Sequence, residues 1–242
     1  MEFAIIAAGE GSRLIKEGIS TPKPLVQLNG IPLIGRLINT FVSNGASKIH
    51  VVINEYSGEV ESYLNSLKLP LTLNIIKKTT SSSLHSFHQL IAHIQDNSIC
   101  LTTVDTIFNE QEFATYLAAF KNENSIDGLM AVTEFVDDES PLYVVTDNDM
   151  QVTHYLDERN DKCRFVSGGI YCLRRPVFGL VDKAIQSGTG RMRNFQRLLV
   201  QEGFKIKAHV FSKIIDIDHA ADITTAGQWL NGAEAAVSDF KI

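Results

Sequence analysis

The chain has 242 residues, of which 44% are hydrophobic and 21% are charged, and its formal net charge is −6. Its length and apolar content are enough for a substantial core, in one large α/β domain or two small ones. The negative charge provides no attraction for nucleic acid or an anionic membrane, so we expect small-molecule partners. The sequence shows no apolar run that approaches a membrane span and no basic segment with a cleavage site near Met1, and we expect a cytoplasmic protein.

Short apolar runs alternate with amphipathic segments, which is typical of a layered α/β fold with a mostly parallel sheet. Strands are predicted at residues 3–8, 48–54, 71–76, 98–103, 128–135, 143–146, 152–156, 164–173 and 205–210. Helices are predicted at residues 32–44, 83–93, 176–186, 194–202 and 219–230, with a further helix beginning at Asn109. Pro32 lies in the opening turn of the first helix and Gly45 lies just past its end, where a left-handed cap is favoured. Asn109 can cap its helix while Glu112 reaches back, as in a capping box.

The most informative segment is a glycine-containing loop directly after the first predicted strand. Gly9 and Gly11 leave backbone N–H groups uncovered, so that a polyphosphate can approach closely. Arg13 and Lys23 supply a bidentate fork and a compact charge for phosphoryl oxygens. The loop therefore predicts a site for a nucleoside triphosphate.

This loop differs from two commoner glycine loops. A dinucleotide-binding fingerprint needs glycine or alanine three residues after the second glycine, where this chain has Leu14. A P-loop needs Gly-Lys-Ser/Thr after four intervening residues, where this chain has Leu14-Ile15-Lys16. The spacing argues against NAD chemistry and against kinases or GTPases of the P-loop type.

Two parts of this segment, Gly9-Glu10-Gly11-Ser12-Arg13-Leu14 and Pro22-Lys23-Pro24-Leu25, resemble the signature of the sugar-1-phosphate nucleotidylyltransferases. In that family a Gly-x-Gly-Thr/Ser-Arg loop precedes Pro-Lys-Pro-Leu by about ten residues. The resemblance implies a three-layer α/β/α Rossmann-like nucleotidyltransferase fold with a mixed, mostly parallel central sheet. It covers nearly the whole chain and implies one catalytic domain at residues 1–242, with a nucleotide half up to about residue 108 and an acceptor half from about residue 109. The C-terminal β-helix that the family often appends is not expected here.

The resemblance also implies a reaction that uses Mg²⁺ as cofactor. A sugar 1-phosphate attacks the α-phosphorus of a nucleoside triphosphate in line, and pyrophosphate leaves. The attacking phosphate is already an anion, so the reaction requires no general base. Arg13 would hold the pyrophosphate and Lys23 would bridge the acceptor and the α-phosphate. The nucleotide would be held by residues of the first strand and loop, namely Ala7, Ala8, Gly9, Gly11 and Ser12.

A polar run at residues 77–86 follows the third predicted strand. Thr80, Ser81 and Ser82 in this run could meet the edge of the nucleotide base through hydroxyl and backbone groups. The alternative is an N-capped loop that leads into the helix at Ser83. The hydroxyls alone do not select a base.

Asp105 follows the strand at residues 98–103, and ligands in open α/β sheets bind beyond the carboxyl ends of strands. We therefore expect Asp105 to hold Mg²⁺, although Val104 replaces the glycine that the family usually has there and an aspartate after a strand is often a helix cap. Asp216 and Asp218 lie on the same side of an extended segment, and either or both could complete the metal site. The alternative for Asp218 is that it caps the helix at residues 219–230. Asp222 is expected in the first turn of that helix.

The acceptor would meet two segments that resemble the family's Glu-Lys-Pro and Asn-Ala-Gly-Ile-Tyr elements. Glu158 could accept hydrogen bonds from ring hydroxyls, and Arg159 would replace the family's lysine with altered geometry. Gly168 and Gly169 would let a sugar ring lie against the backbone. A β-bulge with a solvated charged turn explains the same residues.

Three alternatives for the function and assembly stay open on the sequence. The first is a cytidylyltransferase that acts on phosphocholine or another alcohol phosphate, because the run at residues 77–86 is similar to such proteins. The second is a regulatory subunit that binds nucleotide or sugar without turnover, which the departures at Val104 and Arg159 suggest. A homo-oligomer is also left open.

Overall fold

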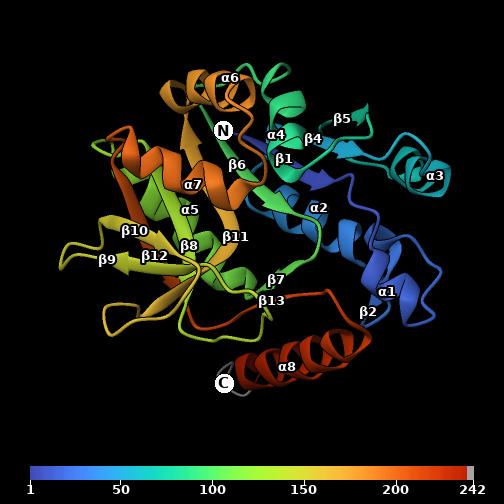
Figure 1. The fold of residues 1–242 in the computed structure, drawn as a ribbon. Coiled ribbons are helices and arrows are strands. Elements are labelled where there is room, and N and C mark those ends of the chain that lie inside the picture. Colours follow the sequence, from blue (N-terminus) through green and yellow to red (C-terminus); the bar gives the residue numbers. More distant parts are fainter. Residues whose placement is uncertain (239–242) are drawn as a thin grey trace.

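The computed structural model describes residues 1–238, with side chains described up to Gly232 (Figure 1). Residues 239–242 lie outside the described residues. They belong to the C-terminal segment for which the sequence predicted no β-helix. Within residues 1–238 nine strands form one mixed sheet. These strands are β1 (Glu2–Ala7), β4 (Lys48–Ile53), β5 (Thr72–Lys77), β6 (Ser98–Thr103), β8 (Gly128–Thr133), β9 (Tyr143–Thr146), β10 (Val152–Leu156), β11 (Phe165–Arg174) and β12 (Ile206–Phe211).

The strand order begins β5-β4-β1-β6-β11 at one edge, and β11 then pairs with both β8 and β9. β12 continues the sheet beside β8, and β10 continues it beside β9. In this sheet β10 and β11 run antiparallel to the other strands. The carboxyl ends of β1, β4 and β6 therefore lie at one edge of the sheet, where a ligand site is expected.

Helices cover both faces of the sheet (Figure 1). The helices are α1 (Ser12–Lys16), α2 (Leu33–Ser43), α3 (Gly58–Ser66), α4 (Ser83–Ile91), α5 (Glu110–Asn122), α6 (Phe178–Gln186), α7 (Met192–Gln201) and α8 (Ala220–Ser238). In β1, Phe3 and Ile5 pack with α2, α3 and α5, whereas Ala4 and Ile6 pack with α4, α6 and α7. Because alternate side chains enter opposite cores, this central strand is apolar from Phe3 to Ala7. The predicted three-layer α/β fold with a mixed, mostly parallel sheet is confirmed.

The strands and helices predicted from the sequence are present, with ends that differ by a few residues. Helices α1 and α3, two short antiparallel pairs and two 3₁₀ turns were not predicted, since segments of two to nine residues carry little periodicity. The short pairs are β2 (Gln27–Leu28) with β3 (Ile31–Pro32), and β7 (Thr106–Phe108) with β13 (Ile214–Asp216); the 3₁₀ turns are Lys23–Leu25 and Arg175–Val177. Helix α8 runs to Ser238, well beyond the predicted end at residue 230.

One of the predicted terminal signals is wrong in part. Asn109 caps α5 through its side-chain oxygen, which accepts from the backbone N–H groups of Gln111 and Glu112 at 2.8 and 3.3 Å. The Glu112 carboxylate instead accepts from the N–H of Ser212 at 3.1 and 3.2 Å, so it fixes the turn between β12 and β13 and does not complete a capping box. The Glu112 carboxylate thus forms a long-range hydrogen bond with Ser212 in place of the local hydrogen bond to the N–H of Asn109.

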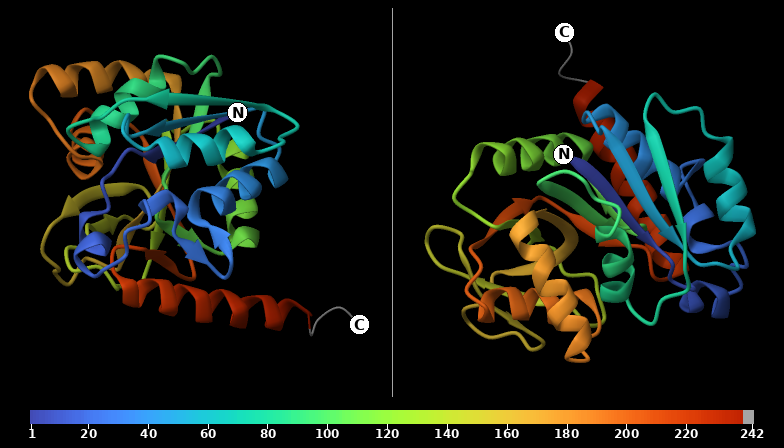
Figure 2. Two further views of the ribbon diagram at one scale, coloured as in Figure 1. Left: turned by 90° about the vertical axis from the view of Figure 1, so that its right-hand side faces the viewer. Right: turned by 90° about the horizontal axis from the view of Figure 1, so that it is seen from above.

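Helix α8, red in Figure 2, lies along the outside of the molecule. A hydrogen bond joins it to the hairpin of β2 and β3. The side-chain amide of Asn29 donates to the carbonyl of Gly227 at 3.1 Å, and Ala226 and Leu230 bury themselves in the core on the α2 side. Among residues 1–238 none of the helices combines the length and apolar character that crossing a bilayer requires.

Candidate active site

The glycine loop lies between β1 and α1, beside the 3₁₀ turn that carries Lys23. Gly11 has φ of +64°, and a Cβ there would lie 3.0 Å from the Cβ of Lys23. Glycine is required at this position both for the left-handed backbone and for the close approach of Lys23. A Cβ on Gly9 would meet no described atom within 4 Å, so the backbone of Gly9 faces open space.

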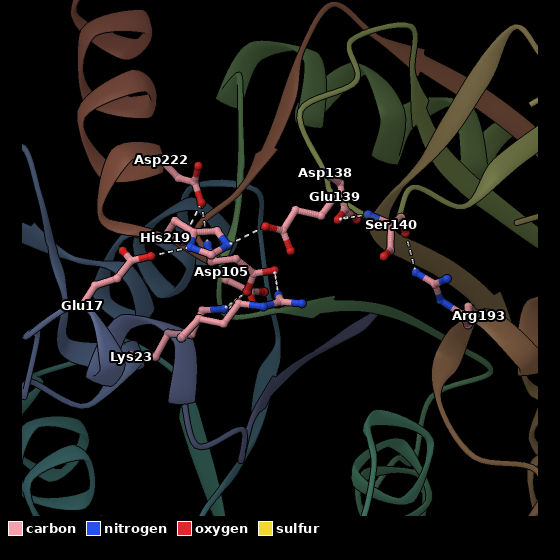
Figure 3. Close-up of polar contacts among 11 residues, drawn as sticks. Glu17, Lys23, Asp105, Asp138, Glu139, Ser140, Arg193, His219 and Asp222 are labelled. Carbon is pink, nitrogen blue, oxygen red and sulfur yellow. Dashed lines mark hydrogen bonds and ion pairs between the residues drawn. The ribbon is translucent and has the colours of Figure 1, made fainter. Parts of the chain in front are cut away.

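Four charged side chains from three distant segments meet beside this loop, and Figure 3 labels two of them, Lys23 and Asp105. The Nζ atom of Lys23 donates to the carboxylates of Asp105 and Asp218, the latter at 2.8 Å to Oδ1. Arg13 Nη1 donates to Asp218 Oδ2 at 2.6 Å. The Lys23 side chain is 10% exposed, so it forms the centre of the cluster, while Arg13 is 49% exposed and reaches it from solvent.

The sheet and the small β7-β13 pair bring these segments together. The N–H of Val104 donates to Ile6 O at 3.0 Å, which fixes the turn after β6 against β1. β13 pairs antiparallel with β7 so that Asp216 lies opposite Thr106, and the N–H of Ile217 donates to Asp105 O at 3.0 Å. The two acidic segments predicted to share a site are therefore neighbours.

The carboxylates differ in their electrostatic surroundings. Burial on its own raises the pKa of Asp218, but Lys23 and Arg13 outweigh it and hold the pKa below its usual range. Burial and the nearby charge of Asp105 raise the pKa of Asp216 to about 8. Burial on its own lowers the pKa of Lys23, but Asp105 and Asp218 outweigh it and raise the pKa to about 12. Lys23 therefore keeps its charge at neutral pH, whereas its opposing effect on Asp216 is too small to hold the pKa of that carboxyl in its usual range.

Asp218 does not cap the last helix, so that alternative is wrong. Helix α8 begins at Ala220, and the Asp218 carboxylate is held by Lys23 and Arg13. The Asp222 carboxylate accepts from the N–H groups of Asp218 and His219 at 2.9 and 2.6 Å. Asp222 lies in the first turn of α8 as predicted, where negative charge suits the helix dipole.

The loop borders a cavity of about 600 Å³, and a second cavity of about 490 Å³ adjoins it. Both are lined by Arg13, Asp105 and Asp218, and Asp216 lines the second. The predicted nucleotide residues that line the first cavity are Ala8, Gly9, Gly11, Ser12, Thr80, Ser81 and Ser82, together with Lys23. Ala7 is buried within β1 and is not among the residues lining either cavity.

The polar run before α4 serves two structural purposes while it lines the first cavity. Ser82 is the N-cap of α4, and its hydroxyl also accepts from the N–H of Arg191 at 3.1 Å. The hydroxyls of Thr80 and Ser86 are 2.6 Å apart. The N-cap that we considered as an alternative is present, and base recognition by Thr80, Ser81 and Ser82 stays a prediction.

The structure gives a packing reason for the paired glycines of β11. A Cβ on Gly168 would lie 2.2 Å from Ile214 Cδ1, and a Cβ on Gly169 would lie 2.9 Å from Thr106 Oγ1. Gly169 has φ of +72°, and the register between β11 and β8 shifts between Ser167 and Tyr171. A β-bulge is therefore present, and Gly169 also lines the second cavity.

Glu158 and Arg159 are exposed, and neither is among the described residues that line the two cavities. Arg159 borders a separate pocket with Asn160, Asp161 and Cys163. The acceptor role of Glu158 and Arg159 stays a prediction, and their position lends it no support.

A basic turn at the start of α7 was not predicted from the sequence. Arg191 and Arg193 line the second cavity together with Ser167 and Gln196. Arg193 Nη2 donates to Ser140 O at 2.7 Å, so it also holds the loop between β8 and β9 (Figure 3). The signal was available in Gly188-Thr189-Gly190-Arg191-Met192-Arg193, where two glycines precede two arginines.

The described residues hold no cluster of three His, Cys, Asp or Glu side chains placed to bind a metal ion. Lys23 instead lies between two of the three carboxylates named above. Asp216 Oδ1 is buried and has no hydrogen-bond partner among the described residues. A buried, unpartnered carboxylate oxygen is costly, and a cation beside it would compensate.

Comparison with known proteins gives a consistent result. Residues 3–186 match the model of the MobA-like NTP transferase domain. The bifunctional protein GlmU of Methanococcus maripaludis is 24% identical over 233 residues, which covers 93% of this chain and 53% of that protein. The chain thus spans about half the length of that relative.

Two further proteins are similar to this chain over nearly the full length of both proteins. The UTP--glucose-1-phosphate uridylyltransferase AglF of Haloferax volcanii is 25% identical over 239 residues, which covers 95% of this chain and 96% of that protein. The solved structure of the inositol-1-phosphate CTP transferase from T. maritima superposes with a TM-score of 0.78 at 19% identity and 94% coverage of each chain. The structural similarity shows a shared fold.

Proposed function

Because the chain belongs to the MobA-like NTP transferase family, we propose that it transfers a nucleotide from a nucleoside triphosphate to a sugar 1-phosphate and releases pyrophosphate. The observation that carries this proposal is the position of Lys23 between Asp105 and Asp218, beside the open backbone of the glycine loop. Cations, carboxylates and free N–H groups at one strand edge are the groups that phosphoryl transfer needs.

Each group has a separate task in this proposal. Arg13 and the N–H groups of the glycine loop hold the triphosphate oxygens that leave as pyrophosphate. Lys23 neutralises charge that is shared between the acceptor phosphate and the α-phosphate. The acceptor phosphate attacks as an anion, so positioning and charge stabilisation supply most of the catalysis.

The carboxylates fit Mg²⁺ as the cofactor. Mg²⁺ prefers hard oxygen ligands from one or two carboxylates together with substrate phosphates, and Asp105, Asp216 and Asp218 supply such oxygens. The unpartnered Asp216 Oδ1 and the contacts of Lys23 both indicate that these carboxylates attract a cation. When bound, Mg²⁺ would withdraw charge from the phosphate oxygens.

The choice of a sugar 1-phosphate as acceptor is supported by AglF, the relative that matches this chain over nearly its whole length. AglF is named for glucose 1-phosphate, and it covers 95% of this chain. A second candidate is cytidylyl transfer to an alcohol phosphate, because the T. maritima neighbour is named as a CTP transferase for inositol 1-phosphate. In either case the second cavity, with Arg191 and Arg193 in its lining, is the place for the acceptor.

Pyrophosphate release tests this proposal. The purified chain is mixed with Mg²⁺, one of four nucleoside triphosphates, and either a sugar 1-phosphate, inositol 1-phosphate or phosphocholine. We expect release with one pair that far exceeds the rate of each triphosphate alone. Binding of nucleotide without release for every pair would instead favour the regulatory subunit.

A thermal-shift panel identifies the nucleotide without turnover. A ligand that binds only the folded state stabilises it by mass action and so raises the melting temperature. At a ligand concentration a hundred times Kd, the free energy of unfolding rises by about 2.7 kcal/mol. We expect one triphosphate with Mg²⁺ to give the largest rise, and EDTA to reduce it. Equal rises in melting temperature for all four triphosphates would show that the loop at Thr80–Ser82 does not select a base.

A further inference from the structure

Glu17 connects the glycine loop at residues 9–13, which is the phosphate loop of the proposed function, to the start of α8. It lies outside the family motif. It is the C-cap residue directly after α1, four positions after Arg13. Its Oε1 atom is 2.5 Å from His219 Nδ1, and its Oε2 atom accepts from the N–H of Ala220 at 2.7 Å. Figure 3 shows the Glu17 side chain directed at His219, with Glu139 approaching the same ring from the other side at 3.5 Å. Both partners of Glu17 directly follow Asp218.

The segment after Asp218 is held as one unit. Asp222 accepts from the N–H groups of both Asp218 and His219, and Ala220 begins the helix. Anchoring Ala220 and His219 through Glu17 therefore also fixes the position of Asp218 relative to the phosphate loop.

Two kinds of contact join the phosphate loop to this unit. Arg13 and Lys23 hold the Asp218 carboxylate directly, at 2.6 and 2.8 Å. A triphosphate would compete for both cations, because phosphate oxygens bind Arg and Lys as carboxylates do. The Glu17 contacts involve neither cation and stay available when nucleotide is bound.

We propose that Glu17 is a positioning residue that holds Asp218 at the site after Arg13 and Lys23 have engaged phosphate oxygens. This inference rests on the proposed function. Asp218 is then free to serve as an oxygen ligand for Mg²⁺, and Glu17 acts on that ligand through His219 and Ala220. Groups that orient a metal ligand from behind commonly change metal affinity by 10–100-fold when they are lost.

A general stabilising role for Glu17 would give a different result. The Glu17 and His219 side chains are 36% and 32% exposed, and exposed ion pairs contribute little to overall stability. Loss of Glu17 should therefore leave the melting temperature of the ligand-free protein nearly unchanged. Its effect should appear in the binding of Mg²⁺ together with nucleotide.

The chain offers a matched control in Glu123. One of its carboxylate oxygens is 2.5 Å from Ser125 Oγ and the other is 3.3 Å from Lys207 Nζ, and its side chain is 38% exposed. Glu123 follows α5 and precedes β8, at the end of the strands opposite to Asp105. It is a carboxylate of similar exposure with a partner on each oxygen, far from the phosphate loop.

The experiment measures the Kd of each of the four nucleoside triphosphates by calorimetry, with Mg²⁺ and with EDTA, for wild type, Glu17→Ala, Glu17→Gln and Glu123→Ala. We expect Glu17→Ala to weaken binding in Mg²⁺ about tenfold and to change binding in EDTA little. Glu17→Gln keeps one acceptor for the Ala220 N–H and should recover part of the loss. Glu123→Ala should match wild type in both conditions.

The outcomes separate this inference from the proposed function. Equal Mg²⁺-dependent affinity in wild type and Glu17→Ala overturns the positioning role, as does an equal loss in EDTA, and pyrophosphate release by wild type would leave the proposed function standing in both cases. Tight Mg²⁺-nucleotide binding without pyrophosphate release removes the proposed function, and the Kd comparison still decides the role of Glu17. If wild type binds none of the four triphosphates, both fail. If Glu17→Ala does not fold, Glu17→Gln gives the decisive comparison.

Discussion

Lys23 is the residue on which the candidate site depends most. Its place in Pro22-Lys23-Pro24-Leu25 fixes it in a short 3₁₀ turn, and Gly11 leaves room for its side chain. In the ligand-free structure the carboxylates of Asp105 and Asp218 neutralise it. The same arrangement places a permanent cation beside the oxygens that a phosphate would bring.

At this scale we predict that Lys23→Ala and Asp105→Asn each lower kcat by about a hundredfold or more, as expected for electrostatic contributions of about 3 kcal/mol. Both variants should stay folded, because each side chain lies at the edge of the sheet and outside the two apolar cores. Steady-state pyrophosphate release measures the effect, and circular dichroism checks the fold. A near-normal rate in either folded variant would contradict the proposed mechanism.

Among the elements, β11 shows how local backbone geometry shapes the site. At its bulge, Gly168 faces Ile214 of β13 and Gly169 faces Thr106 of β7. The two glycines are required for different reasons. Gly169 needs a left-handed backbone, whereas Gly168 needs space for Ile214.

This difference predicts a separable pair of variants. Gly169→Ala should lower the free energy of unfolding by about 2 kcal/mol, because an L-residue in the left-handed region costs about 1–2 kcal/mol and the Thr106 hydroxyl is also displaced. Gly168→Ala should lower it by about 1–3 kcal/mol through overpacking alone. Adding Ile214→Val, which removes the clashing Cδ1, should recover stability in Gly168→Ala and not in Gly169→Ala. Urea unfolding in a double-mutant cycle measures the coupling; absence of coupling between positions 168 and 214 would refute the packing explanation.

At the scale of the whole molecule, a polar cluster is buried near the amino ends of β1, β4 and β5, away from the candidate site. His50 is 1% exposed, with Nε2 at 2.9 Å from Glu2 and Nδ1 at 3.1 Å from Asn74. Burial lowers the pKa of His50, assisted by Lys48 and His93 and opposed by Glu2. A cluster of this kind links the stability of the β1-β4 pair to pH.

The sign of that link follows from the direction of the shift. Folding favours neutral His50, so its contribution to stability is fully present above the ordinary pKa of 6.5 and is lost as pH falls below it. We predict that the free energy of unfolding of His50→Gln falls less between about pH 7.5 and about pH 5.5 than that of wild type. Comparing the two proteins cancels the other titrating groups, including Asp216, whose raised pKa acts in the opposite direction. Parallel pH profiles would show that His50 does not titrate in this range.

Contiguous segments carried most of what the sequence predicted correctly. The main strands and helices follow from apolar periodicity within a dozen residues, and the phosphate loop follows from Gly9, Gly11, Arg13 and Lys23 within fifteen residues. Asp105 was predictable because it follows the recognisable strand β6, and parallel strands bring their carboxyl ends to one edge. Asp216 and Asp218 were predicted from an extended segment that resembles the family, although the short β7-β13 pair, in which Asp216 lies, was not predicted. These features depend on local backbone geometry and on one general rule of sheet topology.

Contacts between distant segments could not be predicted in this way. Glu158 and Arg159 match the expected spacing, yet the turn after β10 leaves them in solvent, whereas Arg191 and Arg193 reach the second cavity from the start of α7. Glu112 meets Ser212 and Glu17 meets His219 across 100 and 202 residues. The sequence alone determined the fold class, the phosphate loop and its cations, because neighbours in the chain fix backbone angles and charge. The tertiary structure decided which remote carboxylates and cations meet, because that depends on how the edges of the sheet and the ends of the helices pack in space.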